Sequence, residues 1–217
     1  MNTIAEFIEN QFYHVYNRTN NKELLFKKRG NQAFFLARYK KYLSPFVKTH
    51  AYALLGTHYH FSIQVKSFKE ILNFISDLHR DRRTVTMNNL LNNTDSKKDL
   101  INKLIINQFQ NFQVSYAKSI NKQFGRNGSL FQKKFKRSVF DPEIKFRYLQ
   151  YYIHHNARKH GLVNEFRDYP YHSYDEIISG SSSIIDVDKV IELFGCIEEF
   201  KKFHNEVHLE ERFTSLD

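Results

Sequence analysis

Two histidines, two residues apart, form the clearest candidate for a reactive site in this sequence. His58 and His60 lie in the apolar segment 53–65, where polar and apolar side chains alternate from residue 58 onward. In an extended strand alternate side chains share a face, so both imidazoles lie on one face, about 7 Å apart from a rise of roughly 3.3 Å per residue. Both rings can reach one metal ion or one phosphate, and imidazole is a common ligand of divalent metals. We therefore expect a divalent metal site on this face.

A tyrosine and an asparagine on a predicted helix form a second candidate group. Residues 141–143 (Asp-Pro-Glu) predict the helix start, because Asp is a favoured N-cap, Pro suits the first helical position and Glu favours the positive end of the helix dipole. Tyr152 and Asn156 are four residues apart and therefore lie on the same helix face. The apolar stripe through Leu149 and Ile153 lies about 60° away around the axis. Tyr152 is therefore expected at the edge of the packed face.

The rest of the sequence predicts the elements that must position these side chains. Strands are expected over residues 11–18, 50–56, 58–66 and 136–140, and helices over residues 31–42, 68–78, 99–124 and 141–160. This order fits an α+β fold: a ferredoxin-like antiparallel sheet with helices on one face, plus an inserted helix and a C-terminal helical tail.

The sequence divides into a main domain, residues 1–178, and a linker with a helical tail, residues 179–217. Within the main domain, residues 80–98 are polar and Asn-rich without a period, which predicts a mobile insertion. The Ser-rich stretch 179–183 is typical of a flexible joint. Short helices are expected over residues 187–194 and 197–208, and their apolar side chains indicate docking or partner contact rather than DNA binding.

Composition favours a nucleic-acid partner. The chain has 217 residues, a formal net charge of +10, a pI near 9.5 and 16% aromatic residues. Phosphates can take the charges and unstacked bases can take the rings, so single-stranded nucleic acid is a suitable ligand, although a basic surface also occurs without that function. The candidate nucleic-acid contacts are Arg18, Arg126, Lys133, Lys134, Lys136, Arg137 and Lys159.

Several other classes of protein are disfavoured. A single cysteine, Cys196, excludes an intramolecular disulfide and a Cys-rich zinc module. No apolar run approaches the roughly 18 residues that a membrane span needs. Residues 1–10 carry two glutamates and no lysine or arginine, unlike a secretory signal or a transit peptide. We expect a cytoplasmic protein that does not associate with membranes.

Five ordered motifs give the sequence a family resemblance. They are His58-Tyr59-His60 after an apolar strand, and residues 13–18 (YHVYNR), 128–132 (GSLFQ), 152–163 (YIHHNARKHGLV) and 168–174 (DYPYHSY). Together they resemble the HUH endonuclease superfamily and, within it, the single-tyrosine transposases that include the REP-associated tyrosine transposases. The match covers roughly residues 11–175, so residues 1–178 would be the catalytic domain.

The resemblance implies a metal-dependent enzyme that nicks and rejoins single-stranded DNA next to hairpins. His58 and His60 would hold Mg²⁺ or Mn²⁺, with Asn156 as a third ligand. Tyr152 would be the nucleophile and would form a 5′-phosphotyrosine. A phenol with a pKa near 10 is only about one part in a thousand ionised at neutral pH, so it needs a phosphodiester activated by the metal.

Three positions depart from the usual family pattern without removing a functional group. Tyr59 stands where an aliphatic residue is usual, Thr57 where Asn or Glu is frequent, and Ala157 where proline is common. These departures concern the geometry of the predicted site rather than its chemistry.

Each candidate side chain also has a simpler structural interpretation. A histidine on a strand is commonly hydrogen-bonded within the fold, Tyr152 could pack like its neighbour Tyr151, and Asn156 could be solvated. Three further histidines are expected to serve packing, phosphate contact or the surface rather than metal binding: His14, His154 and His155.

Three hypotheses follow for the function. The leading one is a DNA-nicking and strand-transferring enzyme of the transposase type that acts on single-stranded or hairpin DNA. The second is a catalytically inactive regulator of the same fold that binds hairpins or single strands. The third is a structural metal-binding domain, which the net charge of +10 disfavours. A homodimer and a monomer are both compatible with the sequence.

Overall fold

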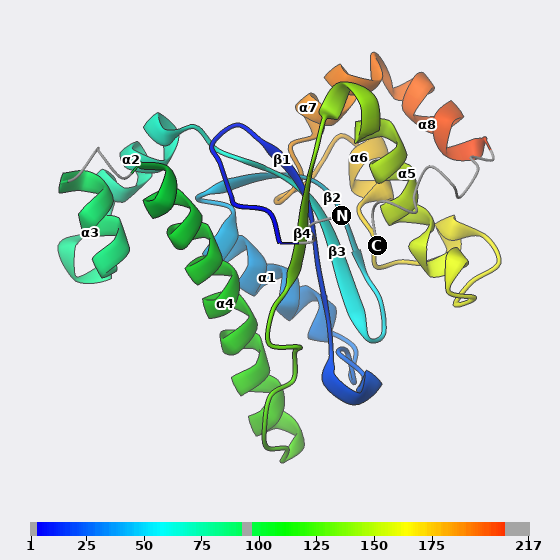
Figure 1. Cartoon of the computed structure of the whole chain (residues 1–217). Helices are drawn as coiled ribbons and strands as arrows, with labels where there is room; N and C mark the ends of the chain where they lie inside the picture. Colours follow the sequence, from blue (N-terminus) through cyan, green and yellow to red (C-terminus); the bar gives the residue numbers. More distant parts are fainter. Residues whose placement is uncertain (1–3, 93–96, 207–217) are drawn as a thin grey trace.

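A four-stranded antiparallel sheet lies at the centre of the computed structural model, which describes residues 4–92 and 97–206 (Figure 1). The strands are β1 (Phe12–Arg18), β2 (Val47–Leu54), β3 (His58–Val65) and β4 (Lys136–Phe140), in the spatial order β2-β3-β1-β4. The expected α+β class with an antiparallel sheet is confirmed.

Helices cover both faces of this sheet, whereas the sequence predicted helices on one face. Phe61 and Ser62 are adjacent in β3 and therefore point to opposite faces. Tyr39 of α1 (Asn31–Leu43) stacks on Phe61 with 4.0 Å between ring centroids, while Gln150 of α5 (Pro142–Lys159) donates to the Ser62 hydroxyl at 3.1 Å. The alternating pattern of β3 predicted one face with polar side chains, and α5 buries that face with hydrogen bonds as well as apolar contacts.

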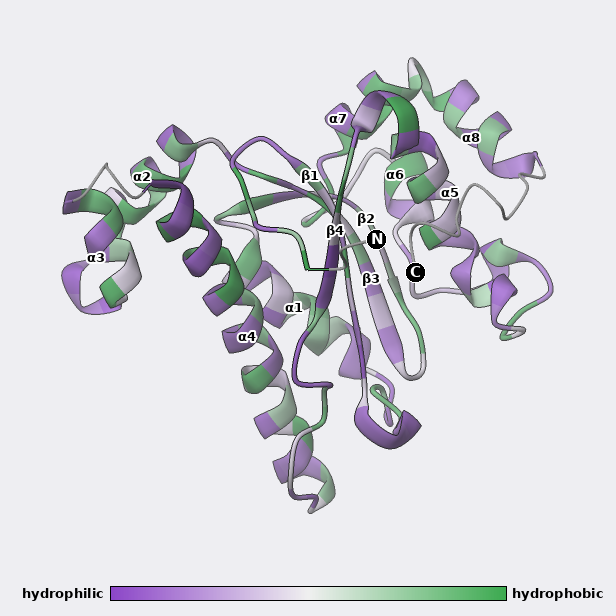
Figure 2. Ribbon diagram, viewed as in Figure 1, coloured by the Kyte–Doolittle hydropathy of each residue, from purple (hydrophilic) through white to green (hydrophobic). Residues whose placement is uncertain are grey.

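The main core lies between the sheet and the helices α1 and α4 (Lys97–Phe124) (Figure 1). Figure 2 shows hydrophobic and hydrophilic residues alternating along α4, as expected for a helix with one buried face. Tyr59, the unusual middle residue of the His-x-His motif, is fully buried in this core, and its hydroxyl accepts a hydrogen bond from Gln113 of α4 at 2.6 Å. The Tyr59 ring therefore packs on the core side of β3, and the opposite face, which carries His58 and His60, is unaffected.

The segment predicted as a mobile insertion contains regular structure. After α2 (Phe68–Asp77), which starts with a capping box formed by Ser67 and Glu70, come the short 3₁₀ helix η2 (Arg80–Arg82) and the helix α3 (Val85–Asn92). Met87 and Leu90 of α3 are buried. The sequence missed this helix because it has only two turns and few apolar positions. Residues 93–96 of the predicted insertion lie outside the described residues, and its mobility stays a prediction.

The C-terminal elements pack around α5. They are η3 (Phe166–Asp168), α6 (Tyr174–Ile178), α7 (Val187–Phe194) and α8 (Ile197–Asn205) (Figure 1). Phe194 and Phe200 are buried, and the Ser182 hydroxyl in the predicted flexible joint accepts from the backbone N–H of Ile185 at 2.9 Å. The end of the helix predicted over 197–208, like the rest of the tail up to residue 217, lies outside the described residues. The division into two domains stays a prediction.

Among the described residues, no helix combines the length and the apolar character that crossing a bilayer requires.

Candidate active site

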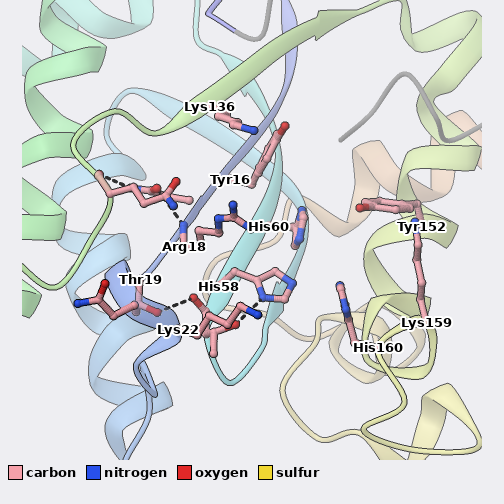
Figure 3. Close-up of a pocket in the computed structure, with 14 residues that line it drawn as sticks. Tyr16, Arg18, Thr19, Lys22, His58, His60, Lys136, Tyr152, Lys159 and His160 are labelled. Carbon is pink, nitrogen blue, oxygen red and sulfur yellow. Dashed lines mark hydrogen bonds between the residues drawn. The ribbon is translucent and has the colours of Figure 1, made fainter.

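Strand pairing places the two motif histidines beside basic and aromatic side chains. Tyr16 of β1 pairs with His60 of β3 on one side and with Lys136 of β4 on the other, so the three residues form one row across the sheet. Arg18 pairs with His58 in the next row on the same face. After β1, the chain turns through the short 3₁₀ helix η1 (Asn20–Lys22) beside these rows (Figure 3).

The helix α5 brings the predicted nucleophile and amide over this face. Asp141 caps the helix by accepting from the backbone N–H of Glu143 at 3.0 Å, and Pro142 occupies its first turn as the sequence predicted. The period of the helix then directs Tyr152 and Asn156 toward the sheet. This placement depends on packing, because the Gln150–Ser62 hydrogen bond fixes the helix on the strand that carries both histidines.

A pocket of about 580 Å³ lies between the sheet and the end of α5. Its lining combines imidazoles, phenols and cations, as Figure 3 shows. The lining residues used below are Tyr16, Arg18, Lys22, His58, His60, Lys136, Tyr152, Lys159 and His160. The structure therefore brings Tyr152 and both motif histidines to one cavity.

Tyr152 is held against the histidines and is more buried than the sequence predicted. Its ring centroid lies 5.7 Å from that of His60, with the two ring planes at 84°. The side chain is 4% exposed, because the sheet covers one side of it and the Nζ of Lys159 lies 5.1 Å from the ring centroid. Figure 3 shows the hydroxyl pointing into the pocket toward His60. A phosphate in the pocket would therefore lie within reach of both groups.

The atoms of His58, His60 and Asn156 form a small donor set that fits a divalent ion. The Nε2 atom of His58 lies 3.3 Å from the Oδ1 atom of Asn156. Two ligand atoms at right angles around an octahedral ion are about 3 Å apart. The Nε2 atom of His60 is buried and has no hydrogen-bond partner among the described residues. The rings of His58 and His60 are 5.2 Å apart.

Acidic ligands are not part of this group. Over residues 4–92 and 97–206, no cluster of three or more His, Cys, Asp or Glu side chains has an arrangement that could hold a metal ion. A metal at the pocket would therefore need the Asn156 amide in addition to the two imidazoles. Such a neutral donor set leaves the positive charge of the ion uncompensated by protein ligands.

His60 is held in its neutral form. Burial is the main cause of a pKa well below the usual histidine value, and the nearby His14, His58, His160 and Lys159 contribute in the same direction. A neutral imidazole has one nitrogen lone pair that can bind a metal. The environment of His60 is therefore compatible with the role of a metal ligand.

Three of the seven predicted nucleic-acid contacts line the pocket: Arg18, Lys136 and Lys159. The other four lie elsewhere. Lys133 and Lys134 are exposed in the segment before β4, and Arg126 forms an ion pair with Glu23 at 2.8 Å.

Arg137 is buried and acts within the fold. Its guanidinium donates to the carbonyl oxygen of Ala5 and lies 4.8 Å from the centroid of the Phe7 ring. Because Arg137 follows Lys136 in β4, the two side chains point to opposite faces of the sheet. The structure therefore does not bring Arg137 to the pocket.

Several pocket residues were missed by reasoning from the sequence alone. Tyr16 and Lys22 line the sheet side, and His160 follows α5 with its ring 4.8 Å from that of His58. His14 lies behind this lining and contacts His60 directly. Phe12, His14 and Tyr16 alternate along β1 and therefore share a face, but only strand pairing reveals which neighbours they meet.

A second group of histidines lies on the other side of α5 and is structural. The Ser173 hydroxyl accepts from the backbone N–H of Tyr52 at 3.0 Å and donates to Nε2 of His154 at 2.9 Å. Nδ1 of His154 donates to Nε2 of His204 at 2.9 Å, and Nδ1 of His204 donates to the carbonyl oxygen of Phe200 at 2.8 Å. Every donor and acceptor in this series of hydrogen bonds has a partner only when the rings of His154 and His204 are both neutral.

Burial keeps these histidines neutral, since it lowers the pKa of His204 to about 3 and that of the neighbouring His155 to about 4. The network ties α8 to α5. His154 and His155 are therefore packing residues, one of the roles expected for them.

The comparisons with known proteins support the fold. No protein-family model matches the sequence, and no curated protein matches it either. A solved structure of a REP-associated tyrosine transposase bound to a REP hairpin is similar, with a TM-score of 0.54 and 13% sequence identity. The similarity covers 85% of this chain and 91% of the other chain. At this identity the likeness shows a shared fold, which is the fold that the motif resemblance implied.

Proposed function

We propose that this protein is a metal-dependent enzyme that nicks single-stranded DNA next to hairpins and transfers the cleaved strand, in the manner of a transposase. The observation that carries the proposal is the phenol of Tyr152 facing His60 at 5.7 Å between ring centroids, in the pocket that His58 also lines. The similar fold of a transposase bound to a DNA hairpin supports the proposal.

The side chains of the pocket suit attack on a phosphodiester. The Tyr152 oxygen would form a bond to phosphorus while the bond from phosphorus to the 3′ oxygen breaks, which gives a 5′-phosphotyrosine and a 3′ hydroxyl. Lys159, whose Nζ lies 5.1 Å from the centroid of the Tyr152 ring, would offset the negative charge of the phosphate under attack. Arg18 and Lys136 would bind flanking phosphates.

The metal would complete this arrangement. His58, His60 and Asn156 would hold Mg²⁺ or Mn²⁺, which would polarise the non-bridging phosphate oxygens and stabilise charge on the leaving oxygen. The same protein groups would serve the reverse reaction, in which a 3′ hydroxyl attacks the phosphotyrosine and joins the strand. Nicking and joining therefore need one site.

A catalytically inactive regulator that binds hairpins or single strands is the second candidate. The observation that favours it is the absence, among the described residues, of a cluster of three His, Cys, Asp or Glu side chains that could hold a metal. Such a protein would use the basic pocket for binding alone.

Covalent capture of DNA separates these two functions. The protein is incubated with Mn²⁺ and a 3′-labelled single-stranded DNA hairpin, because the 3′ part of the strand stays joined to a 5′-phosphotyrosine, and denaturing electrophoresis detects a protein–DNA adduct. The wild-type protein should form the adduct and Tyr152→Phe should not. Tyr151→Phe is a matched control, because the Tyr151 ring stacks on His155 with 3.9 Å between centroids and does not line the pocket.

Two other outcomes would contradict this expectation. An adduct that persists in Tyr152→Phe would reject the assignment of the nucleophile. Hairpin binding by the wild-type protein without any adduct would favour the regulator.

A further inference from the structure

A buried histidine outside the proposed ligand set contacts one of the proposed ligands. His14 of β1 is fully buried, and its Nε2 atom lies 2.9 Å from Nδ1 of His60. The two rings are nearly parallel, with 13° between their planes and 5.1 Å between their centroids. This is a hydrogen bond of ordinary length between two buried imidazoles, so one ring donates and the other accepts.

The direction of this hydrogen bond decides whether His60 can bind a metal. If His60 donates from Nδ1 to His14, its Nε2 atom carries a lone pair that is available to a metal ion. If His14 donates instead, neutral His60 carries its hydrogen on Nε2, which is buried without a hydrogen-bond partner among the described residues. The second arrangement blocks metal binding, because Nε2 of His60 then carries a hydrogen instead of a lone pair.

His14 also touches the proposed nucleophile. Its ring lies edge-on to that of Tyr152, with 5.9 Å between centroids and 81° between planes. On the sheet, the Tyr16 ring stacks on His14 at 4.8 Å and 23°. His14 is therefore held by its neighbours and contacts both His60 and Tyr152.

We propose that His14 is a positioning residue of the active site, which accepts the Nδ1 hydrogen of His60 and thereby directs the His60 Nε2 lone pair toward the metal. The same side chain fixes the distance between His60 and Tyr152. This inference rests on the proposed function, because it assumes that His60 is a metal ligand. It adds a residue that neither touches the metal nor reacts with the DNA.

Direct Mn²⁺ binding to the full-length protein tests the proposal without DNA. Loss of the electron paramagnetic resonance signal of free Mn²⁺ gives the dissociation constant. His14→Gln places an amide oxygen near the former Nε2 position and should bind Mn²⁺ within about threefold of wild type. His14→Asn is one methylene shorter and cannot reach His60, so its affinity should fall about 10- to 100-fold, as expected for losing an outer partner of a metal ligand.

A matched control separates positioning from a general effect on the fold. His50 is a fully buried histidine that stacks on Phe12 and does not line the pocket, so His50→Leu should bind Mn²⁺ like wild type. Melting temperatures of all variants show whether any loss of affinity follows a loss of stability. A purely structural His14 would lower the melting temperature of His14→Asn and leave its Mn²⁺ affinity unchanged.

The outcomes also separate this inference from the proposed function. Equal Mn²⁺ affinity of wild type, His14→Gln and His14→Asn, together with weak binding by His58→Ala, would overturn the role of His14 and leave the metal site intact. Equal affinity of wild type and His58→Ala would overturn both the metal site and the inference.

Discussion

His50 allows the electrostatics of the buried sheet face to be tested quantitatively. Its ring is fully buried, stacked on Phe12 at 5.2 Å and edge-on to Phe146 at 5.4 Å between centroids. Neither ring nitrogen has a hydrogen-bond partner among the described residues. Burial, followed by the charges of Lys189 and Lys48, lowers the pKa of His50 to about 3. The ring is therefore neutral in the folded protein where an unfolded histidine titrates.

This difference makes stability depend on pH. An unfolded histidine has a pKa of 6.5, so His50 takes up a proton on unfolding between pH 6.5 and about pH 3. In that window the unfolded state binds more protons, and the free energy of unfolding falls as the pH falls. The loss is about 1.4 kcal/mol per pH unit, which gives about 2 kcal/mol between pH 7 and pH 5.

Two substitutions separate proton uptake from the burial of polar nitrogens. His50→Leu and His50→Gln both lack the titrating ring, so each should lose about 2 kcal/mol less stability than wild type between pH 7 and pH 5. His50→Leu also removes the unpaired nitrogens and should be about 1–3 kcal/mol more stable than wild type at pH 7. Urea unfolding at both pH values measures these differences. Parallel pH profiles for all three proteins would show that His50 takes up no proton on unfolding in this range.

Three further predictions test the pocket and the core. Lys136→Ala should reduce the slope of log affinity for hairpin DNA against log salt concentration by about 1, because one phosphate contact is lost. Lys98→Ala, which removes an ion pair with Glu6 at 3.0 Å, should leave the slope unchanged. Fluorescence anisotropy over a salt series measures both slopes, and equal slopes for the two variants would contradict the proposed phosphate contact of Lys136. Asn156→Ala should weaken Mn²⁺ binding about 10- to 100-fold while Asn156→Asp, which keeps an oxygen ligand, retains it; calorimetry showing no difference would exclude Asn156 as a ligand. Leu104→Ala, at a fully buried position of α4, should lower the free energy of unfolding by about 2–5 kcal/mol, and a loss under 1 kcal/mol in urea would contradict the described core.

The sequence predicted the elements whose signals are local. β4 was predicted over the residues it occupies, and α5 begins where Asp141 and Pro142 indicated. The polar and apolar alternation of β3 placed His58 and His60 on one face, which the pocket confirms. In each case neighbours in sequence determine the outcome, through capping or through the period of a strand or helix.

The features that the sequence did not predict depend on contacts between distant segments. Nothing local shows that α5 covers the second face of the sheet, because that placement rests on contacts such as Gln150 to Ser62. The His14–His60 contact joins residues 46 positions apart. Arg137 was expected at the DNA because of its charge, but the Phe7 ring and the Ala5 carbonyl surround it in the fold.

The proposed function depends on Tyr152 as the residue that attacks DNA. Mass spectrometry of protease-digested protein, after reaction with hairpin DNA and Mn²⁺ and removal of the DNA by nuclease, locates the attached nucleotide. We expect a nucleotide joined through its 5′-phosphate to the Tyr152 hydroxyl and to no other residue of α5. A nucleotide attached to a different residue, or none attached under conditions in which the protein binds the hairpin and Mn²⁺, would contradict this expectation.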